Sequence, residues 1–223
     1  MLKANKSAWF AFIFALYNRT LFWRRFHNLR VANLDNLRNR DENTPLVLYA
    51  NHSSFWDGLL LFEISRAAKL DFYVMMEEKQ LRNLPLFRLL GAFSVVRENP
   101  RQAVQSLRYA VNLLKQNSKR GLWIFPQGEV LPNDSRPLKF FNGLAKIIQQ
   151  VGECQTVSVA MRYEFLHDFK PLALARIGEI EFYENVKDTK SLTDSLNRNL
   201  TANLDTVKLN VAENDLRDYE NII

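Results

Sequence analysis

The stretch Leu46-Val-Leu-Tyr-Ala-Asn-His-Ser-Ser-Phe-Trp-Asp-Gly58 sets the organisation of this chain. It begins with a short apolar run without charges, which is typical of a strand buried in a sheet. A polar turn follows the run, and a helical pattern then extends over residues 55–69. A buried strand that leads through a tight connection into a helix is the first part of a β-α-β unit, so the stretch predicts a parallel sheet.

The same alternation of short apolar runs and longer helical patterns continues through the rest of the chain. Further strands are predicted over residues 72–76, 93–96, 122–125, 156–160 and 179–183. Further helices are predicted over residues 79–90, 100–118, 139–151 and 191–214. We therefore expect an α/β fold with a mixed, largely parallel sheet flanked by helices, and a ligand crevice outside the carboxyl ends of the strands.

Composition and charge narrow the class of protein. With 223 residues, 47% of them apolar, the chain is long enough for one sizeable core. Its single cysteine excludes an intrachain disulfide framework. Residues 1–40 hold eight basic residues and one acid, which leaves 22 basic and 23 acidic residues for the rest of the chain. A near-neutral body argues against nucleic acid as a partner, because such binding needs a basic groove.

The basic N-terminal segment also contains an unbroken apolar run, AWFAFIFALY, over residues 8–17, and Arg24 and Arg25 follow it. Because a helix needs about 20 mostly apolar residues to span a bilayer, this run alone is short. Aromatic residues beside arginine suit the membrane interface, where the rings lie at headgroup depth and arginine meets anionic lipid. We expect residues 1–30 to form an amphipathic, membrane-associating helix and residues 31–223 to form the main domain. A helix buried in the core is the alternative.

The polar turn carries a candidate reactive pair, His52 and Asp57. Five residues on one continuous helix leave two side chains about 140° apart, so the pair cannot meet on a helix. They can meet if His52 lies in the loop and Asp57 lies in the first turn of the next helix, where the dipole favours a carboxylate. The carboxylate would fix the imidazole tautomer, so that the other ring nitrogen can accept a proton. A capping aspartate beside a loop histidine is the alternative. Without an H-E-x-x-H motif, no metal site is predicted.

Four blocks of the sequence resemble the glycerolipid acyltransferase superfamily, the 1-acylglycerol-3-phosphate acyltransferase-like enzymes, in the family's order. Asn51-His-Ser-Ser-Phe-Trp-Asp57 resembles its N-H-x-x-x-x-D block. Gly91-Ala-Phe-Ser-Val-Val-Arg97 looks like the second block, and Ile124-Phe-Pro-Gln-Gly128 looks like the third, which is usually F-P-E-G-T-R. Leu138-Lys-Phe-Phe-Asn-Gly143 is similar to the F-K-x-G that tends to follow. The resemblance covers residues 50–143 and fades towards the C-terminus.

The resemblance implies an O-acyltransferase in which His52 is the general base on a lipid hydroxyl and Asp57 orients the imidazole. The hydroxyl oxygen would attack a fatty acyl thioester directly, on coenzyme A or acyl carrier protein, and no tightly bound cofactor is implied. The resemblance further implies Arg97 as the anion binder and Gln127, Gly128 and Lys139 as substrate contacts. The partners would be the acyl thioester (with acyl carrier protein as one of its carriers), a lipid acceptor and an anionic membrane surface. The place of action would be the cytoplasmic face of a membrane.

The third block departs from the family pattern. Gln127 stands where glutamate is usual, and Glu129-Val130 stands where threonine and arginine are usual. The change removes a cation from a place where the family would hold phosphate, and it adds an anion that would repel one. A lysophospholipid is the acceptor by default, and a glycolipid or a hydroxylated isoprenoid is the alternative. A non-catalytic lipid-binding protein of the same fold is a further alternative.

Overall fold

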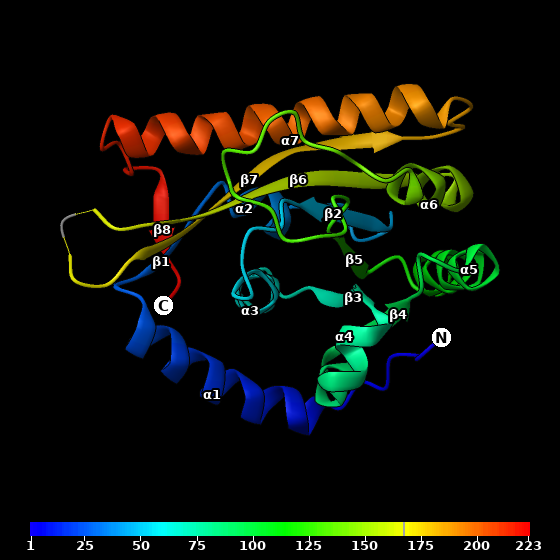
Figure 1. The fold of residues 1–223 in the computed structure, drawn as a ribbon, viewed down its shortest axis with the longest axis horizontal. Helices are drawn as coiled ribbons and strands as arrows, with labels where there is room; N and C mark the ends of the chain where they lie inside the picture. The colour runs from blue at the N-terminus through cyan, green and yellow to red at the C-terminus, as the bar shows by residue number, and fades with distance from the viewer. Residues whose placement is uncertain (167) are drawn as a thin grey trace.

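The computed structural model describes residues 1–166 and 168–223, and in this part of the chain eight strands form one sheet (Figure 1). The strands are β1 (Leu29–Ala32), β2 (Leu46–Ala50), β3 (Asp71–Glu77), β4 (Ala92–Val95), β5 (Arg120–Ile124), β6 (Cys154–Glu164), β7 (Leu172–Tyr183) and β8 (Tyr219–Asn221). Their order is β4-β3-β5-β2-β6-β7-β1-β8. The strands from β4 to β6 are all parallel, whereas β7 is antiparallel to β6 and β8 is antiparallel to β1. The prediction of a mixed, largely parallel sheet is confirmed.

Helices cover both faces of this sheet. They are α1 (Ala8–Arg25), α2 (Asp35–Arg38), α3 (Asp57–Ala67), α4 (Glu78–Asn83), the 3-10 helix η1 (Pro85–Leu90), α5 (Pro100–Gln116), α6 (Gly143–Val151) and α7 (Thr189–Ala212). α1 and α3 pack against one face, and α5, α6 and α7 pack against the other (Figure 1). The result is a three-layer α/β fold with a core on each side of the sheet.

β2 lies in the middle of this arrangement and is buried along its whole length. Leu46, Leu48 and Ala50 belong to the core under α1 and α3, whereas Val47 and Tyr49 belong to the core under α5, α6 and α7. Alternate side chains of a strand point to opposite faces, and here both faces are apolar. This burial on both sides explains the continuous apolar run in the sequence.

Several element bounds differ from the predicted ones. β1 and β8 were not predicted, because strands of four and three residues give too short a pattern to recognise. The strand predicted over residues 179–183 is only the end of β7, which begins at Leu172. The helix predicted over residues 79–90 is divided into α4 and η1, since Pro85 cannot continue an α-helix. The helix predicted from residue 139 begins at Gly143 instead.

α1 is packed on one side only. Its buried side includes Ala15, Asn18 and Phe22, and the Asn18 amide donates hydrogen bonds to the Leu59 carbonyl (3.2 Å) and to the Glu63 carboxylate (2.7 Å) of α3. These contacts fix α1 on the fold, so it is partly a core helix as well as a surface one. Over residues 1–166 and 168–223, no helix combines the length and the apolar character needed to cross a membrane.

Candidate active site

The turn after β2 is held by the side chain of Asn51. Its Oδ1 accepts a hydrogen bond from the Met161 amide (2.7 Å), and its Nδ2 donates one to the Met161 carbonyl (2.9 Å) on β6. The carboxamide therefore continues the pairing of β2 with β6 beyond the last residue of the strand, and it satisfies two buried backbone groups. The next residue, His52, is thereby placed at the carboxyl edge of the sheet.

His52 and Asp57 are in direct contact, as the sequence predicts. His52 Nδ1 lies 2.8 Å from Asp57 Oδ2, with the histidine in the loop and the aspartate at the first residue of α3. The Asp57 side chain is fully buried, whereas the His52 side chain is one-fifth exposed and lines a cavity. Since Nδ1 faces the carboxylate, Nε2 is the ring nitrogen left for a ligand.

The Asp57 carboxylate is held by four contacts. Besides His52, the Ser53 amide (2.6 Å) and the Ser54 amide (2.9 Å) donate to Oδ2, and the Tyr163 hydroxyl donates to Oδ1 (2.7 Å). Burial and the neighbouring carboxylate raise the pKa of the Tyr163 phenol well above its ordinary value, so the hydroxyl keeps its proton and remains a donor. A buried carboxylate with this many donors is fixed in orientation.

Tyr163 is a contact of the candidate dyad that the sequence did not predict. It lies on β6, 106 residues from Asp57 in the chain, and it falls outside all four sequence blocks. An aromatic residue near the end of an apolar strand gives no signal of such a contact. Only the parallel pairing of β2 with β6 brings the hydroxyl to the carboxylate.

Residues of the third sequence block contact both the ring and the backbone of His52. The Phe125 ring stacks on the imidazole with the centroids 4.4 Å apart, and the buried Gln127 side chain accepts a hydrogen bond from the His52 amide through Oε1 (2.9 Å). The Leu131 amide donates to the His52 carbonyl (2.8 Å). Gln127 is thus turned towards the backbone of the histidine and does not line the cavity, although the sequence placed it among the substrate contacts.

The cavity beside His52 has a volume of about 690 Å³ and is mainly apolar. Phenylalanines of four different elements contribute to its walls: Phe14 of α1, Phe62 of α3, Phe72 of β3 and Phe87 of η1. The volume lies within the range of about 300–1,000 Å³ that is usual for ligand sites. A long apolar group can therefore be enclosed with one end at the histidine.

Arg97 and Gly128 meet at the same cavity. Gly128 has a positive φ of 70°, and a Cβ atom there would collide with the Arg97 guanidinium. The guanidinium also lies over the Phe141 ring, 5.3 Å from its centroid, and 3.9 Å from a Glu77 carboxylate oxygen. Arg97, Gly128, Glu77 and Glu129 all line the cavity, so its polar end carries both signs of charge.

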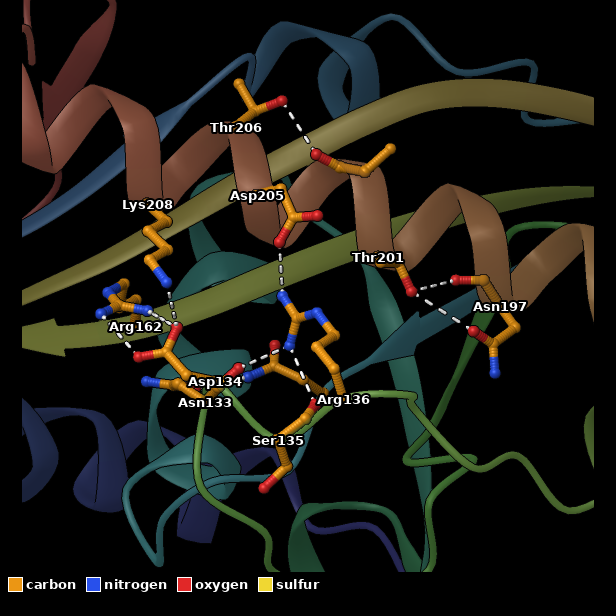
Figure 2. A network of polar contacts seen from close by, with 12 residues as sticks. Asn133, Asp134, Ser135, Arg136, Arg162, Asn197, Thr201, Asp205, Thr206 and Lys208 are labelled. Carbon is orange, nitrogen blue, oxygen red and sulfur yellow. Dashed lines mark hydrogen bonds and ion pairs between the residues drawn. The ribbon is translucent and has the colours of Figure 1, made fainter.

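Lys139 differs from the other predicted site residues, since it is exposed and does not line the cavity. It lies in the connection between β5 and α6, which is fastened to α7 and β6 (Figure 2). Arg136 pairs with Asp205 (2.6 Å), and Asp134 pairs with Arg162 (3.1 Å) and Lys208 (3.4 Å), as Figure 2 shows. These pairs hold the connection, whose Leu131 amide also bonds the His52 carbonyl, against α7 and β6.

Comparison with known proteins places this fold and site among the acyltransferases. The family model described as Acyltransferase matches residues 28–162, and the chain belongs to this family. Its fold is similar to the crystal structure of the 1-acyl-sn-glycerophosphate (LPA) acyltransferase PlsC from Thermotoga maritima, with a TM-score of 0.65. The two chains are 16% identical, and the match covers 89% of this chain and 80% of that chain. No curated protein matches the sequence. The chain is therefore an acyltransferase of this family, with a fold similar to that of PlsC.

Proposed function

We propose that this enzyme transfers a fatty acyl group from an acyl thioester to the hydroxyl group of a lipid, with His52 as the general base. One observation carries the proposal. The imidazole Nδ1 is held by the buried Asp57, and the same side chain lines an apolar cavity. His52 Nε2 takes the proton of the acceptor hydroxyl as its oxygen attacks the thioester carbonyl. The C–S bond then breaks, and the leaving thiolate receives the proton from the imidazolium. The products are an ester and a free thiol.

The developing oxyanion needs fixed N–H donors near His52. The Ser53 and Ser54 amides do not supply them, because both already donate to Asp57. The turn over residues 125–128 is the other source, and Gly128 within it lines the cavity. The Gly128 amide is already bonded to the Phe125 carbonyl (3.0 Å), so we assign the role to the amide of Glu129, which lines the cavity.

The acceptor is a lysophospholipid by default, with Arg97 as the ligand of its phosphate. A second candidate is an acceptor without phosphate, such as a glycolipid or a hydroxylated isoprenoid. This second candidate is favoured by two acids at the polar end of the cavity. Glu77 lies 3.9 Å from the Arg97 guanidinium, and Glu129 follows Gly128 in the sequence and lines the cavity as well. Each acid would repel a phosphate group, whereas both can bind sugar hydroxyls.

The outer side of α1 supports an association with the membrane surface. Trp9, Phe12, Leu16 and Trp23 are all more than half exposed. Their spacings of three, four and seven residues place them on one side of the helix, opposite Asn18 and its buried neighbours. A row of exposed apolar side chains is typical of an interaction site, and tryptophan at both ends suits the headgroup region. The cytoplasmic face is the proposed location, where anionic lipid meets Arg24 and Arg25.

The test is acyl transfer from labelled acyl-CoA and acyl carrier protein to a panel of lysophosphatidate, other lysophospholipids, and neutral or glycosylated lipid alcohols. We expect His52→Ala to abolish transfer. His27→Ala is the matched control, because His27 also has an aspartate partner, Asp168 (2.7 Å), but lies away from the cavity. Full activity of folded His52→Ala protein would refute the proposal. Transfer by neither wild-type protein nor control to any acceptor would favour the non-catalytic lipid-binding alternative.

Vesicle binding tests the membrane association separately. We expect Trp9→Ser with Phe12→Ser to release the protein from vesicles that contain anionic lipid, while transfer in detergent is retained. Leu209→Ser is the control, since Leu209 is equally exposed but lies on α7. Unchanged binding of the α1 variant would refute the role given to this stripe.

A further inference from the structure

The exposed side of α5 carries only positive charge. The helix contains no acidic residue, and Arg101, Arg108 and Lys115 are all exposed. A spacing of seven residues changes the direction of a side chain on a helix by only about 20°, so the three cations follow one line. At 1.5 Å per residue, the line is about 21 Å long. We refer to these three residues as the α5 strip.

Neighbouring acids do not neutralise the α5 strip. In the described part of the chain, none of its three cations has a carboxylate within 4.0 Å. The adjacent helix, α6, adds Lys146 and contains no acid either. The nearest acid in sequence is Glu98, which is exposed ahead of the helix. Many other surface cations of this protein are paired, as Arg38 is with Glu220 (2.8 Å).

The α5 strip begins at the mouth of the active-site cavity. Pro100, Ala103 and Val104 of the first turns of α5 line the cavity, and Val104 is also nearly half exposed. Arg97 precedes the helix and lines the same cavity. A molecule seated on the strip therefore lies beside an entrance that leads to His52.

We propose that the α5 strip is the docking surface for an acidic protein that carries the acyl thioester, an acyl carrier protein. This inference rests on the proposed function and assigns the donor of that reaction. The phosphates of coenzyme A form a compact group, which is bound best by cations that converge on a pocket. The cations of the strip instead lie in a row on a convex helix, which fits an elongated acidic surface of a protein. The carrier body would contact the strip, while its acyl thioester enters the cavity.

Charges at the rim of an interface act mainly on the rate of association and on its salt dependence. Removal of the strip should therefore weaken the binding of the carrier-linked donor without slowing the chemical step. Coenzyme A donors lack the acidic protein surface, so their use should not change. The prediction thus separates a docking surface from a structural role, which would affect both donors.

The experiment compares two donors with the same acyl chain, acyl carrier protein and coenzyme A, in the variant Arg101→Glu, Arg108→Glu, Lys115→Glu. We expect the KM for the carrier-linked donor to rise about tenfold or more. Each exposed charge pair contributes little by itself, but the variant replaces three attractive pairs by repulsive ones. The kcat and the KM for acyl-CoA should stay within about twofold of the wild-type values. The control variant is Lys187→Glu, Lys190→Glu, Arg198→Glu, which makes the same charge change at exposed residues on and before α7, outside the cavity.

The outcomes separate this inference from the proposed function. An equal loss with both donors, an unchanged KM for the carrier-linked donor, or a loss confined to acyl-CoA would overturn the inference while leaving acyl transfer established. If the wild-type protein transferred nothing from either donor, the proposed function would fail. Fluorescence anisotropy with labelled holo acyl carrier protein would then decide on the strip. Binding that is lost in the α5 variant and retained in the α7 variant supports it, and no binding to the wild type refutes it.

Discussion

The replacement of Asp57 by asparagine tests how the dyad works, because the structure fixes the orientation of the new amide. Three N–H groups converge on Oδ2, from the His52 ring and from the Ser53 and Ser54 amides. The asparagine oxygen must occupy this position, since an amide nitrogen there would face three donors. The asparagine nitrogen then faces the Tyr163 hydroxyl, which can accept a hydrogen bond as well as donate one. The imidazole therefore keeps its proton on Nδ1, and only the negative charge is lost.

The magnitude follows from the charge that the variant lacks. Two unit charges about 4 Å apart attract by about 4 kcal/mol at an effective dielectric constant of about 20. At about 1.36 kcal/mol per tenfold change in rate, this corresponds to a loss of about 10³ in kcat. In a serine protease, the corresponding change of aspartate to asparagine forces the wrong imidazole tautomer and lowers kcat by about 10⁴. Because Asp57 does not line the cavity, the KM for the acyl donor should stay unchanged.

The assay is steady-state acyl transfer by wild-type protein and Asp57→Asn, together with ¹⁵N NMR of the His52 ring. We expect kcat to fall about 10³-fold, and we expect the proton to remain on Nδ1 in both proteins. Urea unfolding of both proteins controls for a loss of fold. A loss of less than tenfold would show that the buried charge does not assist the base. A proton on Nε2 in the variant would refute the argument about amide orientation.

Three further predictions concern residues around the site and the core. Gly128→Ala should reduce transfer about tenfold and lower the stability by about 1 kcal/mol, since φ is 70° and the new methyl group displaces Arg97; wild-type activity would contradict this. Burial raises the pKa of the Cys154 thiol to about 12, so a thiol reagent at pH 8 should label it only after unfolding in urea, and rapid labelling of native protein would contradict this. Burial also raises the pKa of Glu63 above its ordinary 4.5, so the native state holds this proton more tightly than the unfolded state. Wild-type stability should therefore fall relative to Glu63→Gln as the pH rises from about 4 to 7, measured by urea unfolding, and a constant difference would contradict it.

The part of the site that could be predicted is the part built from local sequence. His52 and Asp57 are five residues apart, and the end of β2 and the start of α3 are enough to bring them together. The apolar runs that predicted the sheet are local in the same sense, because burial on both faces of β2 and β5 leaves a continuous apolar pattern. Short edge strands leave no such pattern, and for this reason β8 was missed.

Side-chain direction could not be predicted, since it depends on partners far away in the chain. The sequence block that contains Gln127 suggested that this residue contacts the substrate. Its carboxamide instead accepts a hydrogen bond from the backbone amide of His52, 75 residues away. Lys139 follows the same block in sequence, but the chain between β5 and α6 leaves it exposed outside the cavity. The side chain of a loop residue next to a motif can therefore point away from the site to which the motif belongs.

The sequence by itself determined the α/β class of this protein, its acyltransferase family and the pairing of histidine with aspartate, because apolar periodicity and a five-residue spacing act over short distances along the chain. The tertiary structure alone decided that the Tyr163 hydroxyl completes the contacts of Asp57, and that helices and strands from distant parts of the chain enclose an apolar cavity at His52. It also brought the start of α5, and with it one end of the α5 strip, to the mouth of that cavity. These features depend on the order of the strands and on the packing of helices across the sheet. Such contacts join residues up to about a hundred positions apart, and no local pattern records them.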